Sequence, residues 1–172
     1  MVNAADTTTA FITPTSEAVV ADISTAVDGT SEKPVLPDLD YIVPTWFKQQ
    51  AEGHRFMAVF YLPNTTTPVG MGGVELQDFD RQDKDVADLE TGRGCIVSLF
   101  LYKQYRGKGY LGKILSICEE IAREQGKLKV LTIYGLSKAG GYKKFGYTTF
   151  KVGIRNYGGA NDWETQYLEK VL

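Results

Sequence analysis

Short apolar runs rich in β-branched and aromatic residues recur along the chain, and polar or turn-forming segments separate them. Runs of this length and composition predict β-strands. We expect seven strands, at residues 10–13, 54–62, 69–76, 95–102, 128–133, 147–154 and 163–171. The second and third are joined by the segment Pro-Asn-Thr-Thr-Thr-Pro at 63–68, which is typical of a turn and predicts an antiparallel hairpin.

The clearest helical periodicity of apolar residues lies at residues 109–125. Its apolar residues recur at spacings of three and four and therefore share one face of a helix. These residues are Leu111, Ile114, Leu115, Cys118, Ile121 and Ala122. Gly126 is a typical C-terminal stop. Glu119 and Arg123 are four residues apart, and we expect them to form an ion pair on the solvent side of this helix.

Helices are predicted less clearly in the first third of the chain. Ser16 has the side chain of an N-cap and precedes apolar residues at helical spacing up to Gly29. The region 34–44 contains three prolines and is predicted to be irregular. Pro44 is suited to the first position of a short helix, which we expect to end near Gly53.

The order of these elements predicts an α/β fold. Strand 95–102, helix 109–125 and strand 128–133 form one parallel crossover unit, whereas the remaining strands are expected to be antiparallel. A short helix at 139–145 precedes the last two strands. We therefore predict a single domain at 10–172, preceded by a flexible segment 1–9. Its mixed, mostly antiparallel sheet has helices on both faces and one central βαβ crossover.

Composition excludes several classes of protein. The 172 residues are 43% hydrophobic and 23% charged, as in an ordinary globular domain. A net charge of −2 argues against a nucleic-acid binder. No apolar run approaches the ~20 residues of a membrane span, and residues 1–9 lack an export signal, so we expect a cytoplasmic protein. One histidine and two cysteines in apolar surroundings predict no metal site.

The segment between the predicted strand 95–102 and helix 109–125 has the composition of an anion-binding loop. It reads Gln-Tyr-Arg-Gly-Lys-Gly-Tyr-Leu-Gly at 104–112. A helix start offers unpaired N–H groups and a partial positive charge, and glycines allow an anion to approach the backbone closely. Arg106 and Lys108 add formal charge. We therefore predict a phosphate or pyrophosphate site at this loop.

Residues 107–112 also spell G-x-G-x-x-G, the fingerprint of dinucleotide-binding folds. That interpretation, a dinucleotide-binding oxidoreductase, requires an acidic residue about 20 positions on to bind the ribose. Residues 130–134 read Val-Leu-Thr-Ile-Tyr and contain no carboxylate. The chain also has one predicted crossover unit and not a repeated series. The dinucleotide interpretation is therefore a distant alternative.

Two segments resemble signatures of the GNAT acetyltransferase superfamily. Residues 99–109, Leu-Phe-Leu-Tyr-Lys-Gln-Tyr-Arg-Gly-Lys-Gly, resemble its acetyl-CoA-binding motif R/Q-x-x-G-x-G/A. Gln104 or Arg106 can start the motif. Read from Arg106, its sixth position is Leu111, whereas a one-residue insertion places Gly112 there. Residues 142–147, Tyr-Lys-Lys-Phe-Gly-Tyr, are similar to the second signature, Y-x-K-x-G-F.

The resemblance implies how acetyl-CoA would bind. The main chain near Leu99 pairs with the pantetheine arm like an added strand, and the loop amides contact the pyrophosphate. The family often has an asparagine seven residues before the tyrosine, where this chain has Gly135, with Ser137 two residues on. The predicted cofactor-binding residues are Leu99, Phe100, Leu101, Gln104, Arg106, Gly107, Lys108, Gly109, Tyr110, Leu111, Gly112 and Ser137.

The resemblance also implies a reaction, in which a primary amine attacks the thioester directly and receives the acetyl group. Tyr142 matches the position of a general acid that protonates the leaving thiolate. Glu75, the carboxylate within a predicted central strand, is the candidate base; the alternatives are an outward-facing Glu75 without a catalytic role and a water chain in place of a dedicated base. The alternative is a GNAT-like acyl-CoA-binding or regulatory module without turnover. The expected partner is a small-molecule amine, with no nucleic acid or membrane, and the protein is expected to be a monomer or homodimer.

Overall fold

A computed structural model describes residues 8–11, 39–79, 82–125, 127–136, 139–156 and 162–172 of the chain. Its strands form one seven-stranded sheet in the order β1-β2-β3-β4-β5-β7-β6. The strands are β1 (Thr8–Phe11), β2 (Arg55–Tyr61), β3 (Pro68–Glu75), β4 (Arg93–Leu101), β5 (Val130–Leu136), β6 (Thr148–Asn156) and β7 (Asp162–Val171). The helices are α2 (Leu39–Ala51), α3 (Tyr110–Glu124) and the 3-10 helices η1 (Lys103–Tyr105) and η2 (Ala139–Phe145).

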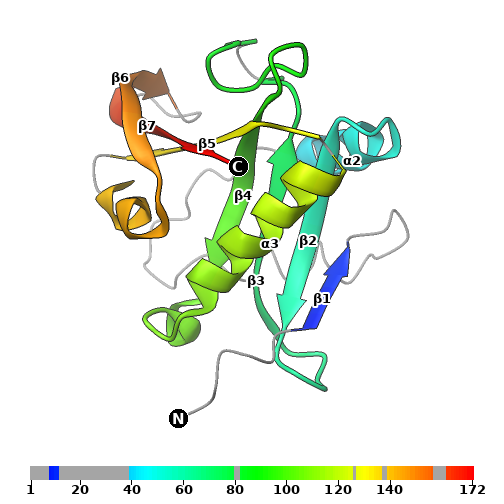
Figure 1. The fold of residues 1–172 in the computed structure, drawn as a ribbon. Helices are drawn as coiled ribbons and strands as arrows, with labels where there is room; N and C mark the ends of the chain where they lie inside the picture. The colour runs from blue at the N-terminus through cyan, green and yellow to red at the C-terminus, as the bar shows by residue number, and fades with distance from the viewer. Residues whose placement is uncertain (1–7, 12–38, 80–81, 126, 137–138, 157–161) are drawn as a thin grey trace.

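The sheet confirms the predicted fold class. Neighbouring strands are antiparallel except β4 and β5, which are parallel and are joined through α3. Figure 1 shows α3 lying across one face of the sheet. On the opposite face, Trp46 and Phe47 of α2 pack against the core. The predicted mixed sheet, single central crossover and helices on both faces are therefore correct.

Two apolar clusters stabilise the fold, one on each face of the sheet. The cluster under α3 includes Ile114, Leu115 and Cys118 of the helix, and all three are at most 1% exposed. The cluster on the other face includes Met57 and Val97. Alternate residues of β2, β3 and β4 contribute to opposite clusters, as expected for strands buried on both faces. Burial of such side chains contributes ~1.5–3 kcal/mol each.

The buried face of α3 agrees with the predicted spacing, but the placement of Glu119 on the solvent side is wrong. Glu119 is 7% exposed. Its carboxylate accepts hydrogen bonds from Lys170 Nζ, 2.8 Å from each oxygen, and from Tyr147 Oη at 3.3 Å. Arg123, the expected partner, is 3.8 Å away. Lys170 of β7 therefore compensates most of the cost of burying this carboxylate.

The start of α2 differs from the prediction. The helix begins at Leu39 and contains Pro44 in its second turn, so residues 39–44 are helical and not irregular. A proline costs most in a helix interior, where it removes a hydrogen bond and clashes with the preceding turn. Pro44 is the sixth residue of α2, so it lies beyond the four N–H groups at the helix start that have no helical acceptor, and the helix tolerates the loss of one hydrogen bond here. The helix predicted from Ser16 lies outside the described residues.

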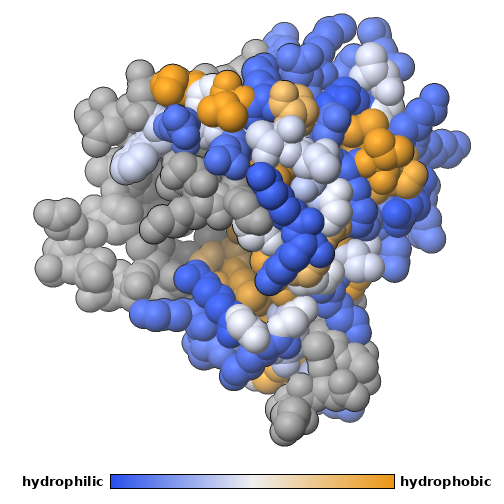
Figure 2. Space-filling view, turned by 60° about the vertical axis from the view of Figure 1, so that its left-hand side comes forward, coloured by the Kyte–Doolittle hydropathy of each residue, from blue (hydrophilic) through white to orange (hydrophobic). Residues whose placement is uncertain are grey.

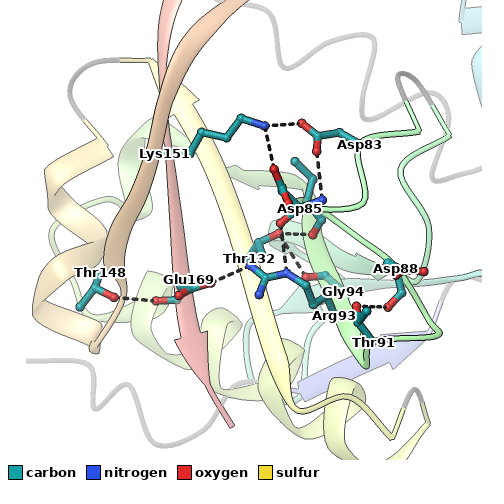
Figure 3. A network of polar contacts seen from close by, with 11 residues as sticks. Asp83, Asp85, Asp88, Thr91, Arg93, Gly94, Thr132, Thr148, Lys151 and Glu169 are labelled. Carbon is teal, nitrogen blue, oxygen red and sulfur yellow. Dashed lines mark hydrogen bonds and ion pairs between the residues drawn. The ribbon is translucent and has the colours of Figure 1, made fainter.

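Ion pairs and hydrogen bonds fasten the acidic connection between β3 and β4 to the far half of the sheet (Figure 3). Lys151 Nζ of β6 lies 2.8 Å from Asp83 Oδ2 and 3.3 Å from Asp85 Oδ2. Burial opposes ionisation of Asp83, but the hydrogen bond from Lys151 lowers the pKa of Asp83 below its usual value. Thr132 Oγ1 of β5 donates to the Val86 carbonyl at 2.7 Å. These acidic residues therefore have structural partners.

Figure 2 shows hydrophilic residues over much of one face, with apolar residues in separate patches. Among the residues that the structure describes, the exposed large apolar side chains are Leu89, Val152, Ile154, Trp163 and Val171. Within the described residues, no helix is long and apolar enough to cross a membrane.

Candidate functional site

The sheet opens between its two parallel strands. The ladder of β4 and β5 joins Arg93–Cys95 to Val130–Thr132, three residue pairs in all. Beyond it β4 stays paired with β3 as far as Leu101, and β5 stays paired with β7 as far as Leu136. In the described part of the chain, residues 96–101 and 133–136 therefore face each other without a shared ladder. Figure 1 shows β5 turning away from β4.

A β-bulge in β4 lies at the start of this opening. Gly73 pairs with Val97, and Met71 pairs with Phe100, so β4 spends one more residue than β3 over the same span. Within the bulge Ser98 has φ +51°, a left-handed conformation that is uncommon outside glycine. Arg55 Nη2 of β2 donates a hydrogen bond of 2.8 Å to Ser98 Oγ. Ser98, a polar residue within an apolar run, is the sequence signal of this bulge.

The predicted phosphate loop connects the end of β4 to the N-terminus of α3. Gly109 is the N-cap of α3 with φ +87°, and Gly107 has φ +74°. Both values are costly for residues with a Cβ atom. Gln104, Arg106 and Lys108 are exposed around them. A glycine N-cap contributes no capping side chain, so the first helical amides, from Tyr110 onward, are oriented toward the loop.

Three contacts order the side chains of this loop. Arg106 Nε donates to the Leu101 carbonyl at 3.0 Å, which ties the loop to the last residue of β4. Tyr105 packs edge-on against the buried Tyr110 with 5.9 Å between ring centroids. Lys108 Nζ lies 5.8 Å from the centroid of Tyr105. The loop thus holds the Arg106 side chain at the end of β4 and the Lys108 side chain beside the Tyr105 ring.

The structure also assigns different roles to Leu111 and Gly112. Leu111 is partly buried and packs against the apolar cluster under α3. A Cβ atom on Gly112 would lie 2.8 Å from Cε1 of Phe145, which is on η2. Gly112 is therefore the residue that permits close approach of α3 and η2, and Leu111 anchors the helix start in the core.

Several predicted site residues meet at the edge of one apolar cluster. Leu99, Leu101, Leu111 and Tyr142 all pack against the cluster under α3. Tyr142 lies on η2, whose bounds match the predicted short helix. Burial raises the pKa of Tyr142 above its usual value, so its phenol, already neutral at pH 7, ionises less readily than a free phenol. Phe100 packs on the opposite cluster, as expected for the alternate residue of a strand. Ser137 lies outside the described residues.

Glu75 is buried on the face of the sheet that α3 does not cover. It is 8% exposed, and its Oε1 accepts a hydrogen bond of 2.9 Å from Arg55 Nη1. Its register partner Cys95 belongs to the cluster on that face. The structure therefore does not bring Glu75 and Tyr142 together, because they pack on opposite faces.

Comparisons with known proteins agree with this geometry. The model of the acetyltransferase (GNAT) family matches residues 23–147. A GNAT-family acetyltransferase from Streptococcus pneumoniae aligns with a TM-score of 0.69 at 15% identity, covering 97% of this chain and 99% of that one. The putative acetyltransferase yncA from Salmonella typhimurium, with its cofactor acetyl-CoA, aligns with a TM-score of 0.67 at 18% identity over 99% and 95%.

A third structure is the spermidine/spermine N-acetyltransferase SpeG from Vibrio cholerae in complex with manganese ions. It aligns with a TM-score of 0.70 at 8% identity, covering 98% of this chain and 94% of that one. At these identities the structures establish a shared fold. No curated protein matches the sequence.

Proposed function

We propose, since the chain belongs to the GNAT acetyltransferase family, that it transfers the acetyl group of acetyl-CoA to a primary amine. The observation that carries this proposal is the opening between β4 and β5, which ends at a glycine-rich, basic loop and the start of α3. The opening leaves strand backbone available for an extended ligand, and the loop suits its anionic end.

Acetyl-CoA fits the residues around this opening. The main chain of 99–101 lies on the side of β4 that β5 has left, so an extended pantetheine arm can pair with it. The amides of 107–112 and the side chains of Arg106 and Lys108 suit a pyrophosphate. Gln104, exposed on η1, is suited to a further polar contact. Ser137 is kept as a predicted contact on the basis of sequence alone.

The proposed reaction is a direct transfer. The neutral amine forms a bond to the carbonyl carbon, the carbon–sulfur bond breaks, and the electron pair leaves on sulfur. Amides near Leu99 polarise the carbonyl. Tyr142, a neutral phenol at pH 7, donates its proton to the departing thiolate. The nitrogen releases one proton to solvent as the amide forms, and the Tyr142 phenolate takes one proton back from solvent, so the overall step neither gains nor loses a proton.

Glu75 and water are the two routes for the amine proton. The Glu75 carboxylate is buried and paired with Arg55 on the face opposite Tyr142. Those contacts favour water as the proton acceptor, and a pH profile of Glu75→Gln distinguishes the routes. The acceptor is proposed only as a class, a small molecule with a primary amine, and a panel of polyamines, amino acids and arylalkylamines identifies its members.

Thermal unfolding with ligands tests the proposal first. The purified protein is heated with acetyl-CoA, free CoA, NAD or ATP in parallel. A ligand present at 100 times its dissociation constant stabilises the folded state by ~2.7 kcal/mol. We expect a higher Tm with acetyl-CoA and CoA only. A shift with NAD and none with CoA would support the dinucleotide interpretation and overturn the proposal.

A matched pair of glycine substitutions tests the loop. Gly107 and Gly53 have φ +74° and +75°, and an added Cβ meets no atom within 4 Å at either position. Gly107→Asp and Gly53→Asp therefore introduce the same backbone strain and the same charge. We expect Gly107→Asp to weaken acetyl-CoA binding at least tenfold in calorimetry and Gly53→Asp to leave it unchanged. Equal effects would remove the loop from the site.

Turnover separates the enzyme from its main alternative, a GNAT-like binding or regulatory module. Such a module would bind acetyl-CoA and release no free CoA in the presence of any amine.

We place the enzyme in the cytoplasm, where the buried thiols of Cys95 and Cys118 stay reduced. It is a monomer or homodimer, and light scattering decides. The edge strand β6, where Val152 and Ile154 are 57% and 60% exposed, is the surface proposed for a homodimer.

A further inference from the structure

Arg55 connects four elements of the fold through one buried guanidinium. The residue is 5% exposed. Its Nη1 donates to Glu75 Oε1 of β3 at 2.9 Å and to Gln49 Oε1 of α2 at 3.4 Å. Its Nη2 donates to Ser98 Oγ of β4 at 2.8 Å. Because the guanidinium is planar, these bonds fix the relative positions of the residues that accept them.

The surroundings of Arg55 hold its side chain in one orientation. The guanidinium carbon lies 4.6 Å from the ring centroid of Trp46, which covers its face. Nε donates to Met57 Sδ at 3.2 Å. The Glu75 carboxylate compensates the buried charge, since the side chains of this pair are only 6% and 10% exposed. A buried ion pair is weak support for stability but gives a strong geometric constraint.

The hydrogen bond from Arg55 to Ser98 holds a residue whose backbone conformation is strained. Ser98 is in the left-handed region at φ +51°, inside the bulge of β4. The next residues, Leu99 to Leu101, are those whose main chain faces the opening. A shift of Ser98 would rotate the amide of Leu99, because the bulge sets the direction of the strand beyond it. The Arg55–Ser98 bond therefore acts one residue before the proposed acetyl-CoA contacts.

We propose that Arg55, held by Glu75, is a positioning residue that fixes the bulge at Ser98 and so orients the amides of 99–101 toward the thioester. This inference rests on the proposed function, because it assigns the task of those amides. It gives Glu75 a role that needs no proton transfer. It also gives a reason for burying this carboxylate and this guanidinium beside the apolar cluster of that sheet face.

Loss of the Arg55–Ser98 hydrogen bond should lower both turnover and the affinity for acetyl-CoA. In Arg55→Lys the compact ammonium cannot contact Glu75 and Ser98 with the same fork geometry. Ser98→Ala removes the accepting oxygen alone. We expect each variant to lower kcat ten- to a hundredfold and to weaken acetyl-CoA binding three- to tenfold. The double variant should lose no more than either single variant, because both changes break one contact.

A matched control separates positioning from a loss of stability. Lys170→Met breaks another ion pair of low exposure, to Glu119, which joins α3 to β7 away from the bulge. We expect Lys170→Met to lower Tm while kcat and the acetyl-CoA Kd stay within twofold of the parent. If Arg55→Lys does not fold, the kcat and the acetyl-CoA Kd of Ser98→Ala alone test the positioning role. Unchanged kcat and Kd in Ser98→Ala, or additive losses in the double variant, would overturn the proposal.

Two further readouts keep the result independent of the proposed reaction. For Glu75→Gln we expect a lower kcat with the pH profile of kcat/KM unchanged in shape, whereas loss of its acidic limb would identify Glu75 as the base and overturn the positioning role. Amide chemical shifts of 99–101 should move in Ser98→Ala and not in Lys170→Met. If the parent protein lacked turnover, the proposed function would fail, and these shifts with the acetyl-CoA Kd would still decide whether Arg55 positions the strand.

Discussion

The ring of Phe145 on η2 occupies the space that a side chain at Gly112 of α3 would need, with 2.8 Å between Cε1 and an added Cβ atom. The contact joins the two segments that resemble family signatures, one at the phosphate loop and one around Tyr142. A glycine at this position lets the helix start lie directly against η2. The close approach of α3 and η2 therefore fixes the position of the loop relative to the proposed acid, Tyr142.

Replacing this glycine should disturb the support. Gly112→Ala forces Phe145 to move, and overpacking of this kind costs ~1–3 kcal/mol. We expect a lower Tm and weaker acetyl-CoA binding. Gly141→Ala on η2 is the control, because an added Cβ there meets no atom within 4 Å. Equal Tm values for the two variants would show that α3 and η2 separate easily.

The proposed acid makes a kinetic prediction. Tyr142→Phe removes one hydroxyl and keeps the ring that packs against the apolar cluster. We expect kcat to fall ~10²-fold, in the range of general acid catalysis, with the acetyl-CoA Kd unchanged. Steady-state rates and calorimetry measure the two quantities separately. A kcat equal to that of the parent would exclude Tyr142 from the chemistry.

The Glu119–Lys170 pair should matter for folding. Lys170→Met leaves a carboxylate of 9% exposure without its nearest cation, and we expect the free energy of unfolding to fall by ~2 kcal/mol, less than for a fully buried pair because Lys170 is partly exposed. Lys48→Met is the matched control. Its pair with Glu52 spans 3.9 Å, with side chains 76% and 48% exposed, and such pairs contribute ~0–1 kcal/mol. Urea unfolding of both variants tests the difference.

Buried thiols predict how stability depends on pH. Burial raises the pKa of Cys95 and Cys118 to about 12, whereas a thiol in the unfolded chain has a pKa of ~8.5. Below that value both states are protonated and the stabilisation is complete. As pH rises toward 12 the unfolded chain loses protons that the folded chain retains, so the free energy of unfolding falls by ~1.4 kcal/mol per pH unit for each thiol.

Urea titrations between pH 8 and 10 measure this slope. Tyrosine and lysine ionisation adds a slope of its own near pH 10, so the informative quantity is the difference between the parent and Cys118→Ala. We expect the variant to start less stable, because a small cavity replaces the thiol, and to lose less stability with rising pH. Parallel curves would show that the thiol is accessible in the native state.

Local patterns predicted most of the fold. The periodicity of α3 is carried by residues within one helix, and the apolar runs of β2, β3 and β4 end within two residues of the observed bounds. The start of α2 was missed because a proline is ambiguous: it opens a helix in one context and is tolerated in the second turn in another. Short-range rules cannot decide between these cases.

The parts that sequence reasoning missed depend on residues far apart in the chain. Lys170 contacts Glu119 across 51 positions, and Arg55 contacts Ser98 across 43. Neither partner has a local signal that identifies the other. The positive φ of Ser98 likewise follows from the register of β3 against β4 and not from serine itself. The candidate loop was found because its glycines, cations and helix start are consecutive.

The ladder of three residue pairs between β4 and β5 also divides the sheet into two parts, β1 to β4 and β5 to β7, which share few pairs of residues. Each part carries one wall of the opening, so a ligand that binds there touches both. Amide exchange in residues 99–101 and 133–136, which border the opening, should therefore slow when acetyl-CoA is bound. Bound acetyl-CoA would bridge the two strands where their ladder ends, and release of CoA would leave their facing edges open again.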